Sequence, residues 1–112
     1  MLSISVIELQ RKIAGQEGIV LIDVREVYEH RAFNIGGLNI PLRTLLQNIN
    51  LIPGDKPVVI YCQKGIRSQL AIQRLKQKSG FENLLNLTGG MYAWVKQFGH
   101  PSGVQTKTAV GD

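Results

Sequence analysis

The only cysteine of this chain, Cys62, stands where a sequence can build a reactive thiol. It directly follows an apolar run at residues 57–61, which is typical of a buried parallel strand. A turn containing Gly65 comes next, and a helical pattern begins near Ser68. A helix N-terminus offers unpaired N–H groups and partial positive charge, so this arrangement stabilises an anion. A thiol placed there is favoured as the nucleophilic thiolate. The segment therefore predicts sulfur chemistry with Cys62 as the catalytic residue.

The spacing from Cys62 to Arg67 distinguishes two kinds of anion-binding loop. Tyrosine-phosphatase signatures place five residues between the cysteine and the arginine, whereas this chain has four. A tetrahedral phosphate needs a wide ring of N–H donors, and one sulfur atom carried on the cysteine needs a tighter ring. The short loop therefore favours transfer of sulfane sulfur. No acid for the leaving group of a phosphate ester can be identified. A phosphatase or arsenate reductase of related fold, and a buried structural cysteine, are the alternatives.

The predicted loop would bind the substrate and surround a persulfide with its backbone N–H groups. Gly65 would let the backbone curl around the sulfur, where a Cβ atom could crowd it. Lys64 and Arg67 are the candidates for attracting an anionic donor, although both could instead project into solvent. The full predicted loop consists of Gln63, Lys64, Gly65, Ile66, Arg67 and Ser68.

The net charge of +5 is concentrated in the half of the chain that contains Cys62. Residues 56–112 hold eight Lys or Arg and two Asp or Glu, whereas residues 1–55 hold five and six. A basic field favours small anions or acidic partners. The alternative is a solvated basic face on the helix that carries Arg74, Lys76 and Lys78. No basic cluster interleaved with aromatics is present, so nucleic-acid binding is not expected.

Two charged residues, Asp23 and Arg25, lie in or beside the apolar run at residues 19–24. A buried charge needs a partner, so we expect this pair to support the loops around the site without taking part in the chemistry. His30 and His100 have no spacing that indicates a metal site or a general base, and both are predicted to be surface residues. We expect no metal and no organic cofactor.

The rest of the pattern predicts strands alternating with helices, and therefore a mainly parallel sheet of about four to five short strands with helices on both faces. Strands are expected at 19–24, 38–42, 57–61 and 83–87. Helices are expected from a cap at Ser5 to Gly15 or Gly18, briefly at 26–32, and at 42–49, 68–79 and 91–98. Three apolar sets should face the core: Val6, Leu9 and Ile13; Leu42, Leu45, Leu46 and Ile49; and Tyr92, Trp94, Val95 and Phe98.

The 112 residues predict one domain at 1–98 and a flexible polar tail at 99–112. No run approaches the length of a membrane span, and no signal peptide is evident. One cysteine cannot form an internal disulfide, which suits a reducing compartment, so a cytoplasmic monomer is expected.

Four sequence blocks together resemble the single-domain rhodanese-like sulfurtransferase family over residues 5–98. Their order and spacing match that family's Asp-Val-Arg-Glu-x-x-Glu element, the turn and strand after it, a six-residue active-site loop, and closing Gly-Phe and Gly-Gly-x-x-Ala-Trp signatures. The blocks here are Asp23-Val24-Arg25-Glu26 with Glu29, Asn34-Ile35-Gly36-Gly37 with Ile40-Pro41-Leu42, Cys62 to Arg67, and Gly80-Phe81 with Gly89-Gly90-Met91-Tyr92-Ala93-Trp94.

The resemblance implies an α/β domain that moves sulfane sulfur in two steps through a Cys62 persulfide. The donor would be thiosulfate or a persulfide, and the acceptor a thiol in the cell or cyanide in an assay. A thioredoxin-like or sulfur-carrier protein could supply that thiol. A persulfide carrier or docking module that turns over poorly would need the same loop, so this alternative stays open.

Overall fold

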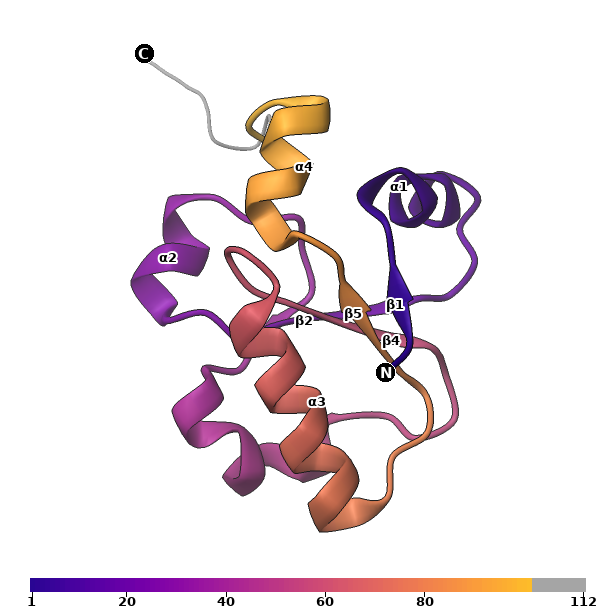
Figure 1. Ribbon diagram of the computed structural model, residues 1–112, viewed down its shortest axis with the longest axis vertical. Helices are drawn as coiled ribbons and strands as arrows, with labels where there is room; N and C mark the ends of the chain where they lie inside the picture. Colours follow the sequence, from indigo (N-terminus) through magenta and orange to yellow (C-terminus); the bar gives the residue numbers. More distant parts are fainter. Residues whose placement is uncertain (102–112) are drawn as a thin grey trace.

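Strands and helices alternate along the chain in the computed structural model, which describes residues 1–101 (Figure 1). The chain-order elements are β1 (Ser3–Ile4), α1 (Val6–Ala14), β2 (Val20–Asp23), α2 (Val27–Ala32), β3 (Leu38–Asn39), the 3₁₀-helix η1 (Leu42–Leu51), β4 (Val58–Tyr61), α3 (Ile66–Ser79), β5 (Leu84–Leu87) and α4 (Gly90–Phe98). Residues 102–112 of the predicted tail lie outside the described residues.

The five strands form one parallel sheet in the order β1-β5-β4-β2-β3. β4 is central, because Val58 pairs with Val20 of β2 on one side and with Leu84 of β5 on the other. All four residues of β4 are buried, which explains why this strand reads as a continuous apolar run. Parallel strands bring their carboxyl ends to one edge of the sheet, so Cys62 lies at the middle of that edge.

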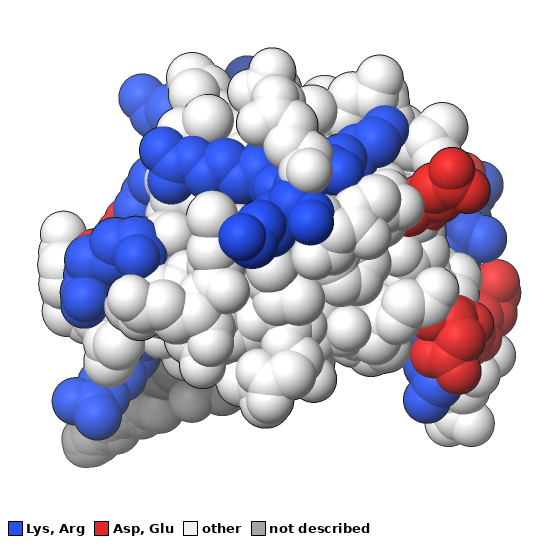
Figure 2. Space-filling model, turned by 90° about the horizontal axis from the view of Figure 1, so that it is seen from below, with Lys and Arg blue, Asp and Glu red and all other residues white. Residues whose placement is uncertain are grey.

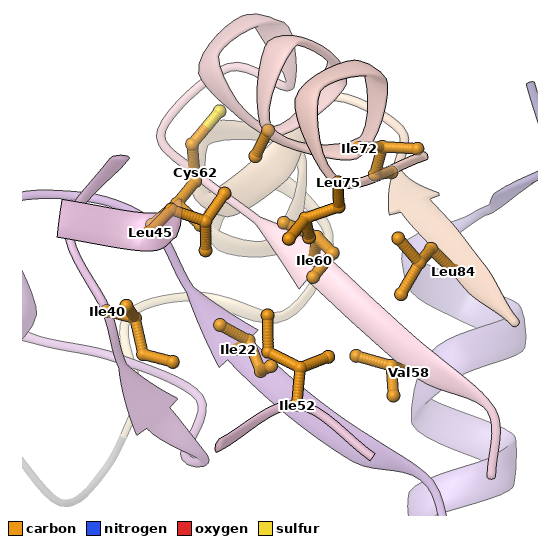
Figure 3. Close-up of a cluster of buried hydrophobic side chains, with 12 residues drawn as sticks. Ile22, Ile40, Leu45, Ile52, Val58, Ile60, Cys62, Ile72, Leu75 and Leu84 are labelled. Carbon is orange, nitrogen blue, oxygen red and sulfur yellow. The ribbon is translucent and has the colours of Figure 1, made fainter. Parts of the chain in front are cut away.

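Helices cover both faces of the sheet, as the sequence predicted (Figure 1). Alternate residues of β4 supply the two cores. Val58 and Ile60 pack under α3 and η1 together with Ile22, Leu45, Ile72 and Leu75 (Figure 3). On the opposite face, Val59 and Tyr61 join a second cluster formed with Ile4, Val6, Leu9, Leu87 and Met91.

Several element ends agree with the signals in the sequence. Ser5 caps α1, and its Oγ accepts a hydrogen bond of 3.1 Å from the N–H of Glu8. Gly15 is the C-cap of α1 and Gly80 that of α3. The helix after Cys62 begins at Ile66, two residues earlier than predicted, because Gly65 in the left-handed region serves as its N-cap.

All three predicted sets of core-facing side chains, those of α1, η1 and α4, were partly wrong. Ile13 is 41% exposed, because α1 buries only Val6 and Leu9, which lie in its first half. The segment at 42–51 is a 3₁₀-helix with three residues per turn, so Leu45 is buried while Leu46 turns outward.

The buried face of α4 begins one residue earlier than the sequence suggested. Met91 is fully buried, and the positions three and four residues later, Trp94 and Val95, are half-buried. Tyr92 and Phe98 were expected in the core but are 55% and 42% exposed. Tyr92 is rotated away from the stripe that starts at Met91, and Phe98 lies in the last turn of the helix.

The two-residue edge strand β1 was not predicted as a strand, because so short a segment carries no periodicity of its own. Within residues 1–101, no helix has both the length and the apolar character needed to cross a membrane.

Candidate active site

Cys62 follows the last residue of β4 and lies beneath the first turns of α3 (Figure 3). Cys62 is fully buried, but it lines a pocket of about 300 Å³ together with Gln63, Lys64, Ile66 and Arg67. The thiol is therefore covered by its own loop and still borders a space that opens toward the surface.

Two backbone N–H groups of the predicted loop donate to the sulfur. The Gly65 nitrogen lies 3.1 Å from Cys62 Sγ, and the Ser68 nitrogen lies 3.3 Å from it. Both belong to the N-terminal end of α3, where the N–H groups of a helix have no partner within the helix. Hydrogen bonds from N–H groups to a sulfur anion stabilise it, and the helix dipole adds to this effect. The loop thus has the geometry of an anion cradle around one sulfur atom.

A chain of buried polar side chains lies behind the sulfur. Ser68 Oγ is 3.4 Å from Cys62 Sγ and donates a hydrogen bond to Asn86 Oδ1. The Asn86 amide nitrogen donates to the Gly65 carbonyl over 3.4 Å. Because that carbonyl only accepts, it orients the amide so that Asn86 Oδ1 faces the serine. Asn86 thereby links β5 to the Cys62 loop.

The sequence analysis did not identify Asn86. Its available signal was an amide inside the otherwise apolar strand β5, where it is buried. A buried polar side chain in a strand needs partners and therefore marks a position worth examining.

The N-terminus of α4 holds the other side of the loop. The Met91 N–H donates to the Cys62 carbonyl over 2.9 Å, and the Tyr92 N–H donates to the Gln63 carbonyl over 2.8 Å. Gly90 makes this approach possible, because a Cβ there would lie 2.3 Å from the Cys62 carbonyl oxygen. The Gly-Gly pair therefore serves close backbone packing beside the thiol.

Arg67 is held by an acidic side chain from α2. Its Nη1 and Nη2 atoms lie 2.7 and 2.9 Å from the two carboxylate oxygens of Glu29. These hydrogen bonds from Arg67 lower the pKa of Glu29 from 4.5 to about 2, although partial burial opposes the shift. The same hydrogen bonds raise the pKa of Arg67 above its ordinary value. Arg67 is thus a paired cation, while Lys64 is an exposed one.

Asp23 and Arg25 form a buried ion pair directly beside the loop. Arg25 Nη2 and Nε lie 2.9 and 3.1 Å from Asp23 Oδ2. The same guanidinium donates to the Phe33 carbonyl over 2.7 Å and to Gln63 Oε1 over 3.4 Å. Among the hydrogen bonds of this pair, the one to Gln63 reaches the loop, a geometry suited to the supporting role that we expected.

The prediction of a surface position was wrong for His30. Its side chain is only 20% exposed, and Nδ1 lies 2.9 Å from Asp23 Oδ2. His100 is exposed, and its ring meets the edge of Phe33 with the centroids 4.9 Å apart. Across residues 1–101, no group of three or more His, Cys, Asp or Glu side chains could hold a metal ion.

Several of the basic side chains outside the loop lie at one end of the molecule. Figure 2 shows lysine and arginine side chains spread over the lower end in Figure 1, with the acidic side chains visible there at its margins, mostly on one side. Arg74, Lys76 and Lys78 of α3 are all exposed. They lie in the middle and last turns of the helix, away from the thiol at its first turn.

Comparison with known proteins identifies the fold and the family. The family model described as Rhodanese-like domain matches residues 5–97. The crystal structure of a rhodanese-like domain protein from Staphylococcus aureus superimposes with a TM-score of 0.79 at 28% identity, covering 96% of this chain and 99% of that one.

Three sequence relatives each align with more than two thirds of this chain. The uncharacterised protein YqhL of Bacillus subtilis is 46% identical over 82 residues, covering 72% of this chain and 64% of YqhL. A sulfurtransferase of Allochromatium vinosum is 36% identical over 89 residues, covering 79% and 82%. The putative sulfur carrier protein YrkF of B. subtilis is 32% identical over 92 residues, covering 81% of this chain and 49% of YrkF. This chain therefore spans less than two thirds of YqhL and about half of YrkF.

Proposed function

The chain belongs to the rhodanese-like family, and on that basis we propose that it transfers sulfane sulfur through a persulfide on Cys62. The central support is the pair of N–H groups, from Gly65 and Ser68, that donate to Cys62 Sγ at the start of α3. This arrangement stabilises a sulfur anion in place. Relatives named as a sulfurtransferase and a putative sulfur carrier agree with chemistry of this class.

In the first step, the Cys62 thiolate attacks the outer sulfur of thiosulfate. A Cys62 S–S bond forms while the S–S bond of thiosulfate breaks, and sulfite leaves with the electron pair. The new outer sulfur extends into the pocket lined by Gln63, Lys64 and Ile66. Lys64 is the exposed cation at this pocket, so it attracts the anionic donor, whereas the charge of Arg67 is largely matched by Glu29.

In the second step, a nucleophilic acceptor takes the outer sulfur. Cyanide or a thiolate attacks this atom, the S–S bond to Cys62 breaks, and Cys62 leaves as the thiolate. The cycle is covalent catalysis that divides one exchange into two steps. It needs no metal or redox cofactor, because the sulfur moves with no net change in the oxidation state of the enzyme. A reducing compartment such as the cytoplasm suits this chemistry, since the cysteine must stay reduced between cycles.

A persulfide carrier is the second candidate, favoured by the complete burial of Cys62 and the similarity to YrkF. In a carrier, Cys62 would accept sulfur readily but release it only to a docked thioredoxin-like or sulfur-carrier protein. The phosphatase and arsenate reductase alternatives gain no support from the loop, because only four residues separate Cys62 from Arg67.

Intact mass spectrometry and a turnover assay together test the proposal. The protein is incubated with thiosulfate, freed of excess donor and weighed, and thiocyanate formation is then measured with cyanide. We expect the mass of one added sulfur on the wild type and none on Cys62→Ser, whose fold is checked by circular dichroism. Lack of the adduct on folded wild type would refute the persulfide. Adduct with rapid thiocyanate formation supports the enzyme, and stable adduct with negligible turnover supports the carrier.

A further inference from the structure

A second pocket lies beside the one at Cys62 and has no role in the steps above. Its volume is about 320 Å³, which is the lower end of the range of small-ligand sites. Phe33, Tyr92 and Val95 provide its apolar lining, and Lys96 and His100 lie at it as well. Tyr92 is 55% exposed even though its neighbour Met91 is fully buried. An exposed aromatic side chain in a concave apolar site is characteristic of recognition surfaces.

Gln63 belongs to both pockets and forms the wall between them. This wall is held in place from two sides. Arg25 contacts Gln63 Oε1, and the N–H of Tyr92 donates to the Gln63 carbonyl over 2.8 Å. Arg25 also holds the Phe33 carbonyl. The second pocket is therefore placed against the Cys62 loop by the same buried ion pair that braces the loop.

The charged side chains that line the two pockets are all positive. Lys96 lies at the second pocket and Lys64 at the first, and both are exposed. Among the described residues that line them, neither pocket includes an Asp or Glu. The nearby carboxylate of Glu29 is already matched by Arg67. An occupant that carries a carboxylate is complementary to this surface, and one that carries an ammonium group is repelled.

We propose that the second pocket is a subsite for the sulfur acceptor, and that it binds an apolar side chain adjacent to an acidic residue in a segment of an acceptor protein. The proposal rests on the function proposed above. The apolar side chain enters between Phe33, Tyr92 and Val95, and the carboxylate pairs with Lys96. The acceptor thiol then reaches over Gln63 to the persulfide.

The transfer itself conserves atoms and electrons. The acceptor thiolate attacks the outer sulfur of the Cys62 persulfide, forming a new S–S bond on the acceptor. The bond between the two persulfide sulfurs breaks, and Cys62 leaves as a thiolate. The second pocket adds only binding and orientation, which raise the rate for an acceptor that fills it and leave cyanide without that benefit.

Transfer from preloaded, desalted persulfide protein to three synthetic peptides tests the subsite. The peptides are Cys-Gly-Gly-Leu-Glu, Cys-Gly-Gly-Leu-Lys and Cys-Gly-Gly-Ser-Glu, all amidated at the C-terminus, and each is also made with one and three glycines. We expect the Leu-Glu peptide to react roughly ten-fold faster than the other two at its best spacer length. Equal rates for all peptides at every spacer length would overturn the proposal.

Two charge-reversal variants locate the preference on the surface. Lys96→Glu should invert it, so that the Leu-Lys peptide becomes faster than the Leu-Glu peptide. Lys78→Glu makes the same charge change in the last turn of α3 and should leave the preference as in the wild type. The preference is the ratio of the two peptide rates within each variant, so an effect on the persulfide itself cancels. A Lys96→Glu protein with unchanged peptide preference would refute the proposed contact.

Two outcomes distinguish a failure of the subsite from a failure of the persulfide function. A wild-type protein that takes up no sulfur from thiosulfate, or from a persulfide donor, refutes the persulfide function and the subsite together. A protein that loads normally but discriminates among no peptides refutes the subsite alone.

Discussion

Two helices begin at the Cys62 loop, and their N-termini are used differently. α3 starts after Gly65 and α4 after Gly89, and both glycines are in the left-handed region, with φ of 90° and 75°. At α3, the N–H groups of Gly65 and Ser68 point at the cysteine sulfur. At α4, the first N–H groups donate to the backbone carbonyls of Cys62 and Gln63.

The contrast shows that a glycine-capped helix start is not in itself an anion site. Its N–H groups attract a ligand only where the protein provides no backbone acceptor for them. Here α4 binds the two carbonyls that begin the loop, and α3 offers N–H groups to the sulfur. α4 therefore shapes the loop, and α3 stabilises negative charge on the cysteine sulfur.

The largest expected effect comes from breaking the contact of α4. Gly90→Ala places a methyl group 2.3 Å from the Cys62 carbonyl oxygen at a residue whose φ is +57°. We expect a loss of about 3 kcal/mol in the free energy of unfolding, measured by urea denaturation. Gly18→Ala, at a φ of +74° where nothing lies within 4 Å, is the matched control. Equal stability of the two variants would contradict the assigned close approach.

The second test acts on α3. Gly65→Ala puts a Cβ atom 3.2 Å from the Gly89 nitrogen at a φ of +90°. We expect the free energy of unfolding to fall by about 1–2 kcal/mol. The rate of persulfide formation should fall by a larger fraction than the stability does, because the displaced Gly65 N–H no longer points at the sulfur. The rate of sulfur uptake from thiosulfate measures this loss. Uptake at the wild-type rate would show that the Gly65 N–H is dispensable.

A third substitution tests the polar side chains that lie behind the sulfur. In the native geometry, Ser68 donates to Asn86 Oδ1, so its hydroxyl has no proton to offer Cys62. Asn86→Ala frees that proton to stabilise the thiolate. The charged groups around the loop, Arg67 with Glu29, Asp23 with Arg25, and Lys64, remain in place. We expect iodoacetamide to alkylate Cys62 faster in Asn86→Ala than in the wild type at pH 7.

The double variant Ser68→Ala with Asn86→Ala is the control for this change. It lacks the freed hydroxyl, so it should be alkylated no faster than the wild type. Equal alkylation rates for the wild type and Asn86→Ala would argue against the serine as the responsible donor.

The smallest expected effect concerns the ion pair between Glu29 and Arg67. Because folding lowers the pKa of Glu29 from 4.5 to about 2, the pair contributes stability above pH 4.5 that is lost as the pH falls toward 2. Glu29→Gln should therefore cost about 1 kcal/mol or less at pH 7 and less still near pH 2. Urea denaturation at several pH values measures the difference. A difference that does not depend on pH would contradict this assignment.

Local patterns were sufficient to predict most of the fold. The apolar run before Cys62, the capping residue Ser5 and the terminating Gly80 each depend on neighbours close in sequence, and the structure agrees with them. β1 was missed because its two residues are organised by pairing with β5, far along the chain. The predicted buried face of α4 was one residue off, because Met91 and not Tyr92 packs against the sheet.

The sequence alone determined the position of the thiol in the fold, since a strand, a glycine turn and a helix are encoded within one short segment. Tertiary structure decided which charges and amides act there. Arg67 meets Glu29 across 38 positions, and Ser68 meets Asn86 across 18. His30 lies on Asp23 because α2 packs back over the end of β2. Hydrogen bonds and ion pairs act over a few ångströms in space, so only the folded arrangement of strands and helices selects their partners.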